Sequence, residues 1–120
     1  MDKNKEIIFD WPEEKTLKLD FDWIPPKDFL EDWEMIARGI IDRIGFKAVE
    51  FQKFKSSSNR GLHVFIKLNE EVSDMLRLKL QFLLGDDRGR CFYNWQDIQL
   101  GMEGWNKLFI SNRRKRIRLE

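Results

Sequence analysis

The 120-residue sequence contains very few of the residues on which the chemistry of small domains often depends. It has one cysteine, one histidine and one tyrosine, which are Cys91, His63 and Tyr93. A single cysteine excludes an intrachain disulfide and a metal site built from several cysteines. We therefore expect Cys91 to be a small thiol in the core of an intracellular protein.

The sequence also lacks long hydrophobic runs and an excess of charge of either sign. The first residues, MDKNKEIIFDW, do not contain the apolar segment of a signal peptide, and no run approaches membrane-spanning length. The 22 Lys and Arg side chains nearly balance the 21 Asp and Glu side chains, so the net charge of +1 indicates no particular partner. We expect a cytoplasmic protein without a membrane segment, of a size that fits a gene carried by a virus or a plasmid.

Positive charge is concentrated in one place, the C-terminal segment SNRRKRIRLE. We predict one domain over residues 1–112, followed by a basic tail over residues 113–120. A tail of this kind is usually a solvated chain end, but beside a nucleic-acid site it would become part of the binding surface.

The first half of the chain predicts a strand, a helix and a second strand in succession. Residues 16–24, TLKLDFDWI, alternate between apolar and polar side chains, which is typical of a strand with one buried face. A double proline ends this strand, and apolar residues spaced three and four apart predict a helix over residues 27–44. Gly45 is placed to end the helix in the left-handed conformation. AVEFQKFK, residues 48–55, predicts the second strand.

The second half predicts a strand, a helix and a strand. GLHVFIKL, residues 61–68, alternates in the same way and places His63 on the face opposite the core. Asn69 is the expected cap of a helix that ends at Gly85. RCFYNW, residues 90–95, predicts a fourth strand. Its core side is assigned Cys91, Tyr93 and Trp95, and its other side Arg90, Phe92 and Asn94.

This order of elements, β-α-β-β-α-β, predicts an α+β fold with a ferredoxin-like or RRM-like sheet. Two helices would cover one face of the sheet, and the other face would remain open for a site. A further strand over KLFIS, residues 107–111, could extend the sheet at its C-terminal end.

The open face of the predicted sheet gathers the polar residues that could carry chemistry. Because the first and third strands are neighbours in this topology, Asp20, Asp22 and His63 would lie within roughly 5–8 Å of one another at Cβ. Two carboxylates at this spacing can bind a divalent cation together with phosphates and water. The loop KSSSNRG, residues 55–61, offers backbone N–H groups and an arginine to a phosphate. Each feature alone also fits a solvated strand face or a hairpin turn.

The span from LDFD to KSSSNRGLHVFIKL resembles the catalytic palm of the archaeo-eukaryotic primase superfamily, above all the primase-polymerase domains of bacterial end-joining ligases. That superfamily has an Asp-x-Asp motif on its first palm strand and a Ser-x-x-(Lys/Arg)-Gly-x-His motif on a later one. Asp20 and Asp22 match the first motif, and the second is matched by Ser57, Arg60, Gly61 and His63. The resemblance implies that Asp20 and Asp22 bind Mg²⁺ or Mn²⁺ and are catalytic together with His63. It also implies contacts to the phosphates of a nucleoside triphosphate from Ser57, Ser58, Arg60 and His63.

The third acidic residue of the superfamily is missing from its expected place. Asn94 stands where the ligase-associated domains have an aspartate. An amide offers an oxygen but no negative charge, and two-metal phosphoryl transfer needs that charge. Either Asp97 or Asp87 takes over as the third ligand, or the protein binds one metal and a nucleotide with poor or no catalysis.

Three functions remain open from the sequence. The first is a DNA or RNA primase-polymerase-like nucleotidyltransferase, which adds a nucleotide to a 3′-hydroxyl in replication or repair beside a helicase or another replication subunit. The second is a catalytically degenerate palm that binds a nucleotide or single-stranded nucleic acid as a replication accessory. The third is a plain interaction domain. Primed or single-stranded DNA or RNA would cross the open face, and the expected contacts are Phe65, Phe92, Arg88, Arg90, Arg113, Arg114 and Arg116.

Other enzyme classes fit less well. A rolling-circle endonuclease needs a pair of histidines and a tyrosine on a helix, whereas this chain has one histidine and Tyr93 is expected on a core-facing strand. A serine or cysteine hydrolase needs an oriented partner for its histidine, and a Walker loop is absent from the sequence.

Overall fold

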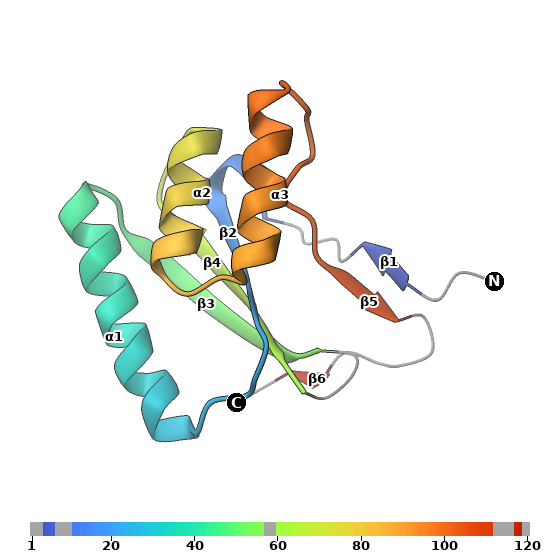
Figure 1. Cartoon of the computed structure of the whole chain (residues 1–120). Coiled ribbons are helices and arrows are strands. Elements are labelled where there is room, and N and C mark those ends of the chain that lie inside the picture. Colours follow the sequence, from blue (N-terminus) through green and yellow to red (C-terminus); the bar gives the residue numbers. More distant parts are fainter. Residues whose placement is uncertain (1–3, 7–10, 57–59, 112–116, 119–120) are drawn as a thin grey trace.

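The computed structural model describes residues 4–6, 11–56, 60–111 and 117–118, and Figure 1 shows their arrangement. The helices are α1 (Lys27–Ile44), α2 (Asp74–Leu83) and α3 (Arg88–Gln99), with a 3-10 turn η1 (Glu13–Lys15). The strands are β1 (Asn4–Glu6), β2 (Thr16–Phe21), β3 (Ala48–Lys55), β4 (Leu62–Leu68), β5 (Phe109–Ser111) and β6 (Ile117–Arg118). The predicted α+β class is confirmed.

The main sheet is antiparallel and has the strand order β2-β4-β3-β6. The predicted adjacency of the first and third strands is therefore confirmed, and the register places Asp20 directly opposite His63. Residues 117–118, which the sequence assigned to the tail, form β6 along the edge of β3. β5 lies within the predicted KLFIS strand, but it pairs with β1 in a separate two-stranded ribbon.

The main core lies between this sheet and the helices. Leu17 and Leu19 of β2 are fully buried, as are Val64 and Ile66 of β4, so the predicted parity of both strands is confirmed. Helix α1 has the predicted bounds and closes the core with Ala37 and other apolar residues. Gly45 ends α1 with φ at 104°, the left-handed conformation that glycine adopts without a steric cost.

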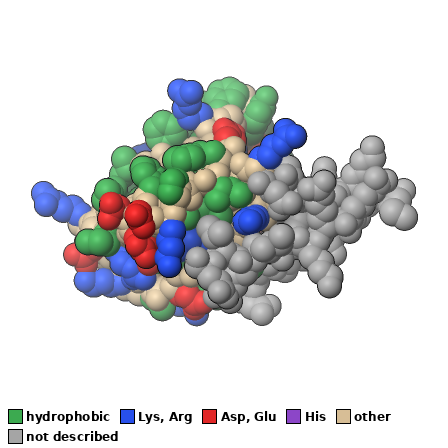
Figure 2. All heavy atoms as spheres, turned by 90° about the horizontal axis from the view of Figure 1, so that it is seen from below, with side chains coloured by type: hydrophobic (Ala, Val, Ile, Leu, Met, Phe, Trp, Pro, Cys, Tyr) green, Lys and Arg blue, Asp and Glu red, His purple; other side chains and the backbone are tan. Residues whose placement is uncertain are grey.

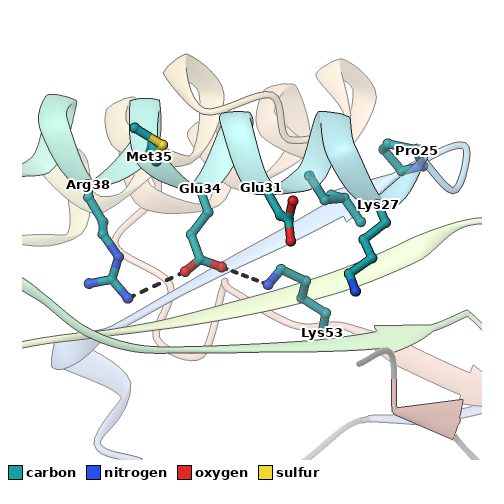
Figure 3. Close-up of a pocket in the computed structure, with 8 residues that line it drawn as sticks. Pro25, Lys27, Glu31, Glu34, Met35, Arg38 and Lys53 are labelled. Carbon is teal, nitrogen blue, oxygen red and sulfur yellow. Dashed lines mark hydrogen bonds and ion pairs between the residues drawn. The ribbon is translucent and has the colours of Figure 1, made fainter.

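Polar contacts fix α1 to the neighbouring strand β3. Glu34 of α1 contacts Lys53 of β3 at 2.7 Å and Arg38, one turn further along α1, at 3.5 Å (Figure 3). These side chains border a cavity of about 440 Å³ between α1 and β3. Among the residues that the structure describes, no candidate site residue from the sequence lines this cavity.

Helix α2 begins later than predicted. Ser73 is its cap and accepts a hydrogen bond from the Leu76 N–H. Asn69 instead accepts from the Lys47 N–H at 2.9 Å and ties the end of β4 to the start of β3. The cap predicted at Asn69 is therefore wrong, because its short side chain is used between strands.

The predicted fourth strand over residues 90–95 is wrong, because this segment lies within α3. The Asp87 side chain caps that helix by accepting from the Arg90 N–H at 2.8 Å. The buried residues of α3 are Cys91 and Asn94, three apart as a helix requires. The core position predicted for Cys91 is confirmed, whereas Tyr93 is exposed and not in the core.

Groups from α2, α3 and the turn between them close the outer edge of β2 where a fourth strand was expected. The Lys18 N–H donates to Gln81 Oε1 at 3.0 Å, and the Asp20 N–H donates to Asp86 Oδ1 at 2.8 Å. The Lys18 carbonyl accepts from Arg90 Nη1 at 2.9 Å, and the Asp20 carbonyl accepts from the Asp87 N–H at 3.0 Å. Because buried backbone groups need partners, these bonds replace a ladder of strand hydrogen bonds.

The sheet face opposite the main core is also covered in its central part. Phe65 is fully buried there and packs with Phe54, Leu108 and Trp11. Lys18 reaches across the same face and donates to the Asn106 carbonyl at 2.8 Å. The expectation of an open face is therefore wrong at these positions, because segments before β2 and after α3 fold back over it.

Candidate functional site

Asp20 and His63 form the centre of the candidate site. They lie opposite each other on β2 and β4, and Asp20 Oδ1 is 3.5 Å from His63 Nε2. The His63 side chain is almost entirely buried, whereas about a third of the Asp20 side chain, 35%, is exposed. The approach of these two side chains, predicted from strand parity, is therefore present in the structure.

A cavity of about 640 Å³ opens beside this pair, and we call it the His63 cavity. Helix α3 and the segment that follows it form its wall with the edge of β2 and β4. The sequence-selected residues that line it are Asp20, His63, Asp87, Arg90, Asn94 and Asp97. Asn94 and Asp97 thus line the same cavity as Asp20, although they lie on a helix and not on the predicted strand.

Asp22 lies in the bend after β2 and borders a second concavity of about 550 Å³, the Asp22 hollow. Asp20, Asp86 and Asp87 border it as well, together with Arg88 at the start of α3. Asp20 and Asp87 line both spaces, so the carboxylates stand where the hollow and the His63 cavity meet.

The electrostatics of this junction favour a proton or another cation at Asp20. Burial raises the pKa of Asp20 from 3.8 to about 6; the Arg90 guanidinium lowers it, and Asp86, Asp87 and Asp22 add to the rise. A pKa this close to neutrality means that Asp20 exchanges its proton in the range where many enzymes work.

Asp86 and Arg90 form the internal tie that holds the site together. Asp86 Oδ2 accepts from Arg90 Nη1 at 2.6 Å, and burial raises the pKa of Asp86 against the opposing effect of Arg90. The five N–H groups of Arg90 are matched by five hydrogen bonds, to Asp86, Lys18, Asn106 and twice to Lys107. No donor of Arg90 is left for a phosphate, so we do not retain Arg90 as a nucleic-acid contact.

Cys91 belongs to this tie and does not act as a nucleophile. Its Sγ lies 3.4 Å from Asp86 Oδ2, and the side chain packs with Leu78 and Trp105. Burial, with the nearby Asp86 charge, raises the pKa of Cys91 to about 12. The thiol therefore stays protonated at physiological pH.

Asn94 occupies an unusual position in the cavity wall. Its side chain is buried on α3, and within the described residues its Nδ2 has no hydrogen-bond partner. A buried donor without a partner costs roughly 1–3 kcal/mol. Asn94 faces the cavity that holds Asp20, but it does not lie at a strand end like the third acidic residue of the primase superfamily.

The predicted phosphate loop is described only at its two ends. Ser57 and Ser58 lie outside the described residues, whereas Arg60 is exposed immediately before β4. A Cβ at Gly61 would lie 2.5 Å from the Phe21 carbonyl oxygen. Glycine is therefore required at this place because the start of β4 passes close to the end of β2, beside the site.

The predicted nucleic-acid contacts have different outcomes. Arg113, Arg114 and Arg116 lie outside the described residues. Stacking of Phe65 on bases is wrong, because its ring is fully buried. Arg88 and Phe92 are exposed on α3, so both remain predictions for a nucleic-acid surface.

The sequence did not reveal the buried polar residues that support the carboxylates around Asp20. Asp86, Gln81 and Asn106 are all buried and bonded to β2 or to one another, yet none was selected. A signal existed in GDDRG, where a carboxylate follows a helix end and a second one precedes the next helix. A polar glutamine on the apolar face of a predicted helix was a second signal.

The residues partly fit the Mg²⁺ or Mn²⁺ ion that the resemblance implies. Within the described parts of the chain, no group of three or more His, Cys, Asp or Glu side chains is arranged to hold a metal ion. Asp20 and Asp22, with Asp87 near them, supply the oxygen ligands that a hard cation takes when phosphates and water complete its coordination. The fit is therefore to one ion shared with a substrate.

Comparisons with known proteins leave the family open. No protein-family model matches the chain, and no solved structure matches it. Over 82 residues, or 68% of this chain, it is 30% identical to Uncharacterized protein 30 of Sulfolobus islandicus filamentous virus (isolate Iceland/Hveragerdi). The chain spans only about a third, 31%, of the length of that viral relative. In the described residues, no helix is long and apolar enough to cross a membrane.

Proposed function

We propose that this domain is a primase-polymerase-like nucleotidyltransferase that transfers a nucleotide to a 3′-hydroxyl. The observation that carries the proposal is the junction at Asp20, where His63 lies 3.5 Å away and Asp22 and Asp87 border the adjoining hollow. A cavity of about 640 Å³ beside it is within the size range of sites that enclose small ligands.

Each residue of the junction has a role in this proposal. In the ion-free site Asp20 has a pKa of about 6, so a proton competes with the proposed cation for its carboxylate. His63 and Arg60 contact the phosphates of the incoming nucleoside triphosphate. A Mg²⁺ or Mn²⁺ ion, when bound at Asp20 and Asp22, supplies positive charge against those phosphates. The viral source of the relative supports a gene carried by a virus, and a helicase or another replication subunit remains the proposed partner.

A second candidate function is a palm that binds a nucleotide or single-stranded nucleic acid without transferring it. The observation that favours it is the lack, within the described residues, of a group of three or more metal-binding side chains. Two-metal catalysis needs such a group, whereas binding of one nucleotide with one ion does not.

Primer extension separates the two candidates. Purified protein is incubated with a primed template, Mn²⁺ and labelled nucleotides, and Asp22→Ala is compared with the exposed control Glu70→Ala. Nucleotidyl transfer predicts that wild type and Glu70→Ala extend the primer and that Asp22→Ala lowers the rate at least about a hundredfold. Extension by Asp22→Ala at the wild-type rate would refute the assignment.

Thermal unfolding with a nucleoside triphosphate and Mn²⁺ tests binding alone. A ligand that binds only the folded state increases the free energy of unfolding, by about 2.7 kcal/mol at a hundredfold excess over Kd, and therefore raises the unfolding temperature. A shift without extension favours the second candidate. No shift and no extension would exclude both.

A further inference from the structure

The groove between α2 and α3 is an exposed apolar surface that adjoins the Asp22 hollow and shares Phe82 and Arg88 with it. It has a volume of about 510 Å³, and its walls include Phe82, Leu83, Phe92 and Trp95, each about half exposed. Among the described residues that line it, the charged ones are Lys79 and Arg88, both cationic. In the described part of the chain neither of them forms an ion pair. An apolar groove of this kind marks an interaction surface, because isolated monomers seldom expose such patches.

The outer face of α1 carries the complementary features. Phe29, Met35 and Ile36 expose 51%, 72% and 61% of their surfaces. Asp28 and Asp32 lie among them, also exposed. Positions 29, 32 and 36 share one side of a helix because they are spaced by three and four residues. α1 therefore presents an apolar stripe with acidic residues, although Arg43 adds one positive charge near its end.

Both surfaces belong to the helical layer of the molecule. Figure 1 shows α1, α2 and α3 beside one another on one side of the sheet, with α1 at one flank and α3 at the other. Trp33 of α1 donates to the Leu84 carbonyl at the end of α2, which fixes the two helices together. On the face seen in Figure 2, hydrophobic side chains lie exposed among acidic and basic ones.

We propose that a second copy of this chain covers the α2–α3 groove with the outer face of its α1. A two-fold axis that runs between the helical layers carries the α1 flank of one copy onto the α2–α3 flank of the other. The contact then forms twice, and in each the acidic α1 face meets Lys79 and Arg88 of the opposite groove. A closed dimer of this kind is the commonest symmetric assembly.

Charge favours a second copy over single-stranded nucleic acid as the occupant. A nucleic-acid strand would find Lys79, Arg88 and the aromatic rings attractive, but it would leave the apolar stripe of α1 exposed beside Asp28 and Asp32. Pairing α1 with the groove buries both apolar surfaces and opposes charges of unlike sign. The proposal does not depend on the nucleotidyltransferase activity.

Sedimentation equilibrium between about 1 and 100 µM protein tests the dimer, since this range covers the Kd values expected for a contact of moderate size. Wild type should reach the mass of two chains. Lys79→Glu and Asp32→Lys should each raise Kd at least about tenfold, which is about 1.4 kcal/mol. The exposed Glu70→Lys should leave Kd unchanged, because this residue lies outside both surfaces.

Mixing the two variants provides the decisive control. In a mixed pair, one contact joins a wild-type α1 face to a wild-type groove, and the other joins a reversed α1 face to a reversed groove. The equimolar mixture should therefore dimerise at least about tenfold more tightly than either variant alone. A monomeric wild type, or variants whose mixture stays as weak as each alone, would overturn the proposal.

Discussion

The carboxyl group of Asp20 is predicted to destabilise the folded protein at neutral pH. The perturbation that shows this is Asp20→Asn, which replaces the ionisable group with a neutral group of the same shape. Burial raises the Asp20 pKa from 3.8 to about 6, so the folded state binds a proton more tightly than the unfolded state. The resulting stabilisation is complete below about pH 4 and is lost as the pH rises through about 6.

The magnitude follows from the shift and the exposure. A rise of about two pKa units corresponds to about 3 kcal/mol when fully expressed. Because 35% of the side chain is exposed, solvent screening reduces this to about 1 kcal/mol. Asp20→Asn should therefore match wild type near pH 4 and be more stable by about 1 kcal/mol near pH 8.

Urea unfolding at the two pH values measures this difference directly. Glu70→Gln, at an exposed position, serves as the control and should differ from wild type by less than about 0.5 kcal/mol at both. Lower stability of Asp20→Asn near pH 8 would refute the reasoning, because the attraction between His63 and ionised Asp20 would then outweigh the cost of burial. If Asp20 also holds the proposed cation, adding Mg²⁺ near pH 8 should stabilise wild type and not Asp20→Asn.

Two further predictions concern residues around the junction. Gly61→Ala should lose about 2 kcal/mol in urea unfolding, because the added Cβ meets the Phe21 carbonyl oxygen at 2.5 Å. Gly39→Ala in α1, where a Cβ meets nothing within 4 Å, should instead raise the free energy of unfolding by about 1 kcal/mol. Equal effects of the two alanine substitutions would contradict the close approach of Gly61 to the Phe21 carbonyl. Asn94→Leu should keep or raise stability by about 1 kcal/mol, because Nδ2 lacks a partner in the described structure. Gln81→Leu should lower the free energy of unfolding by about 2 kcal/mol, because it removes the hydrogen-bond acceptor of the Lys18 N–H and of Asn106 Nδ2. An equally large loss in Asn94→Leu would contradict the absence of a partner for Asn94 Nδ2.

The part of the fold that the sequence predicts is the part governed by local periodicity. Alternation over β2 and β4 identifies both strands and the side chains that face the main core, and the double proline with Gly45 gives both ends of α1. The pairing of Asp20 with His63 follows, because parity and strand adjacency are enough to set it. The spacing in α1 predicts the helix but not its core side, because Phe29 and Ile36 of the predicted apolar pattern are exposed and Leu30, Ala37 and Ile41 are buried.

The error over residues 90–95 has a physical cause. Cys91, Tyr93 and Trp95 alternate with polar residues, but the same letters place Cys91 and Asn94 three apart on a helix. Over six residues the two periods cannot be separated. Asp87 decides in favour of the helix as its cap, and the edge of β2 is already closed by Asp86, Gln81 and Arg90. Those side chains bond to β2 residues that lie more than 60 positions earlier in the sequence. A local sequence pattern contains no information about contacts at that separation.

The closure of the β2 edge also explains why Asp87, and not a residue of a fourth strand, lies beside Asp20. A fourth strand would have brought its own side chains to β2, and Asn94 would have been the acidic position. With α3 in that place, the turn before it contacts β2 at residues 86–87, where the Asp87 N–H donates to the Asp20 carbonyl at 3.0 Å. Asp87 thereby borders both spaces that meet at Asp20. If the proposed nucleotidyl transfer is correct, the negative charge that Asn94 lacks would come from Asp87, and Asp87→Asn should then lower primer extension as strongly as Asp22→Ala.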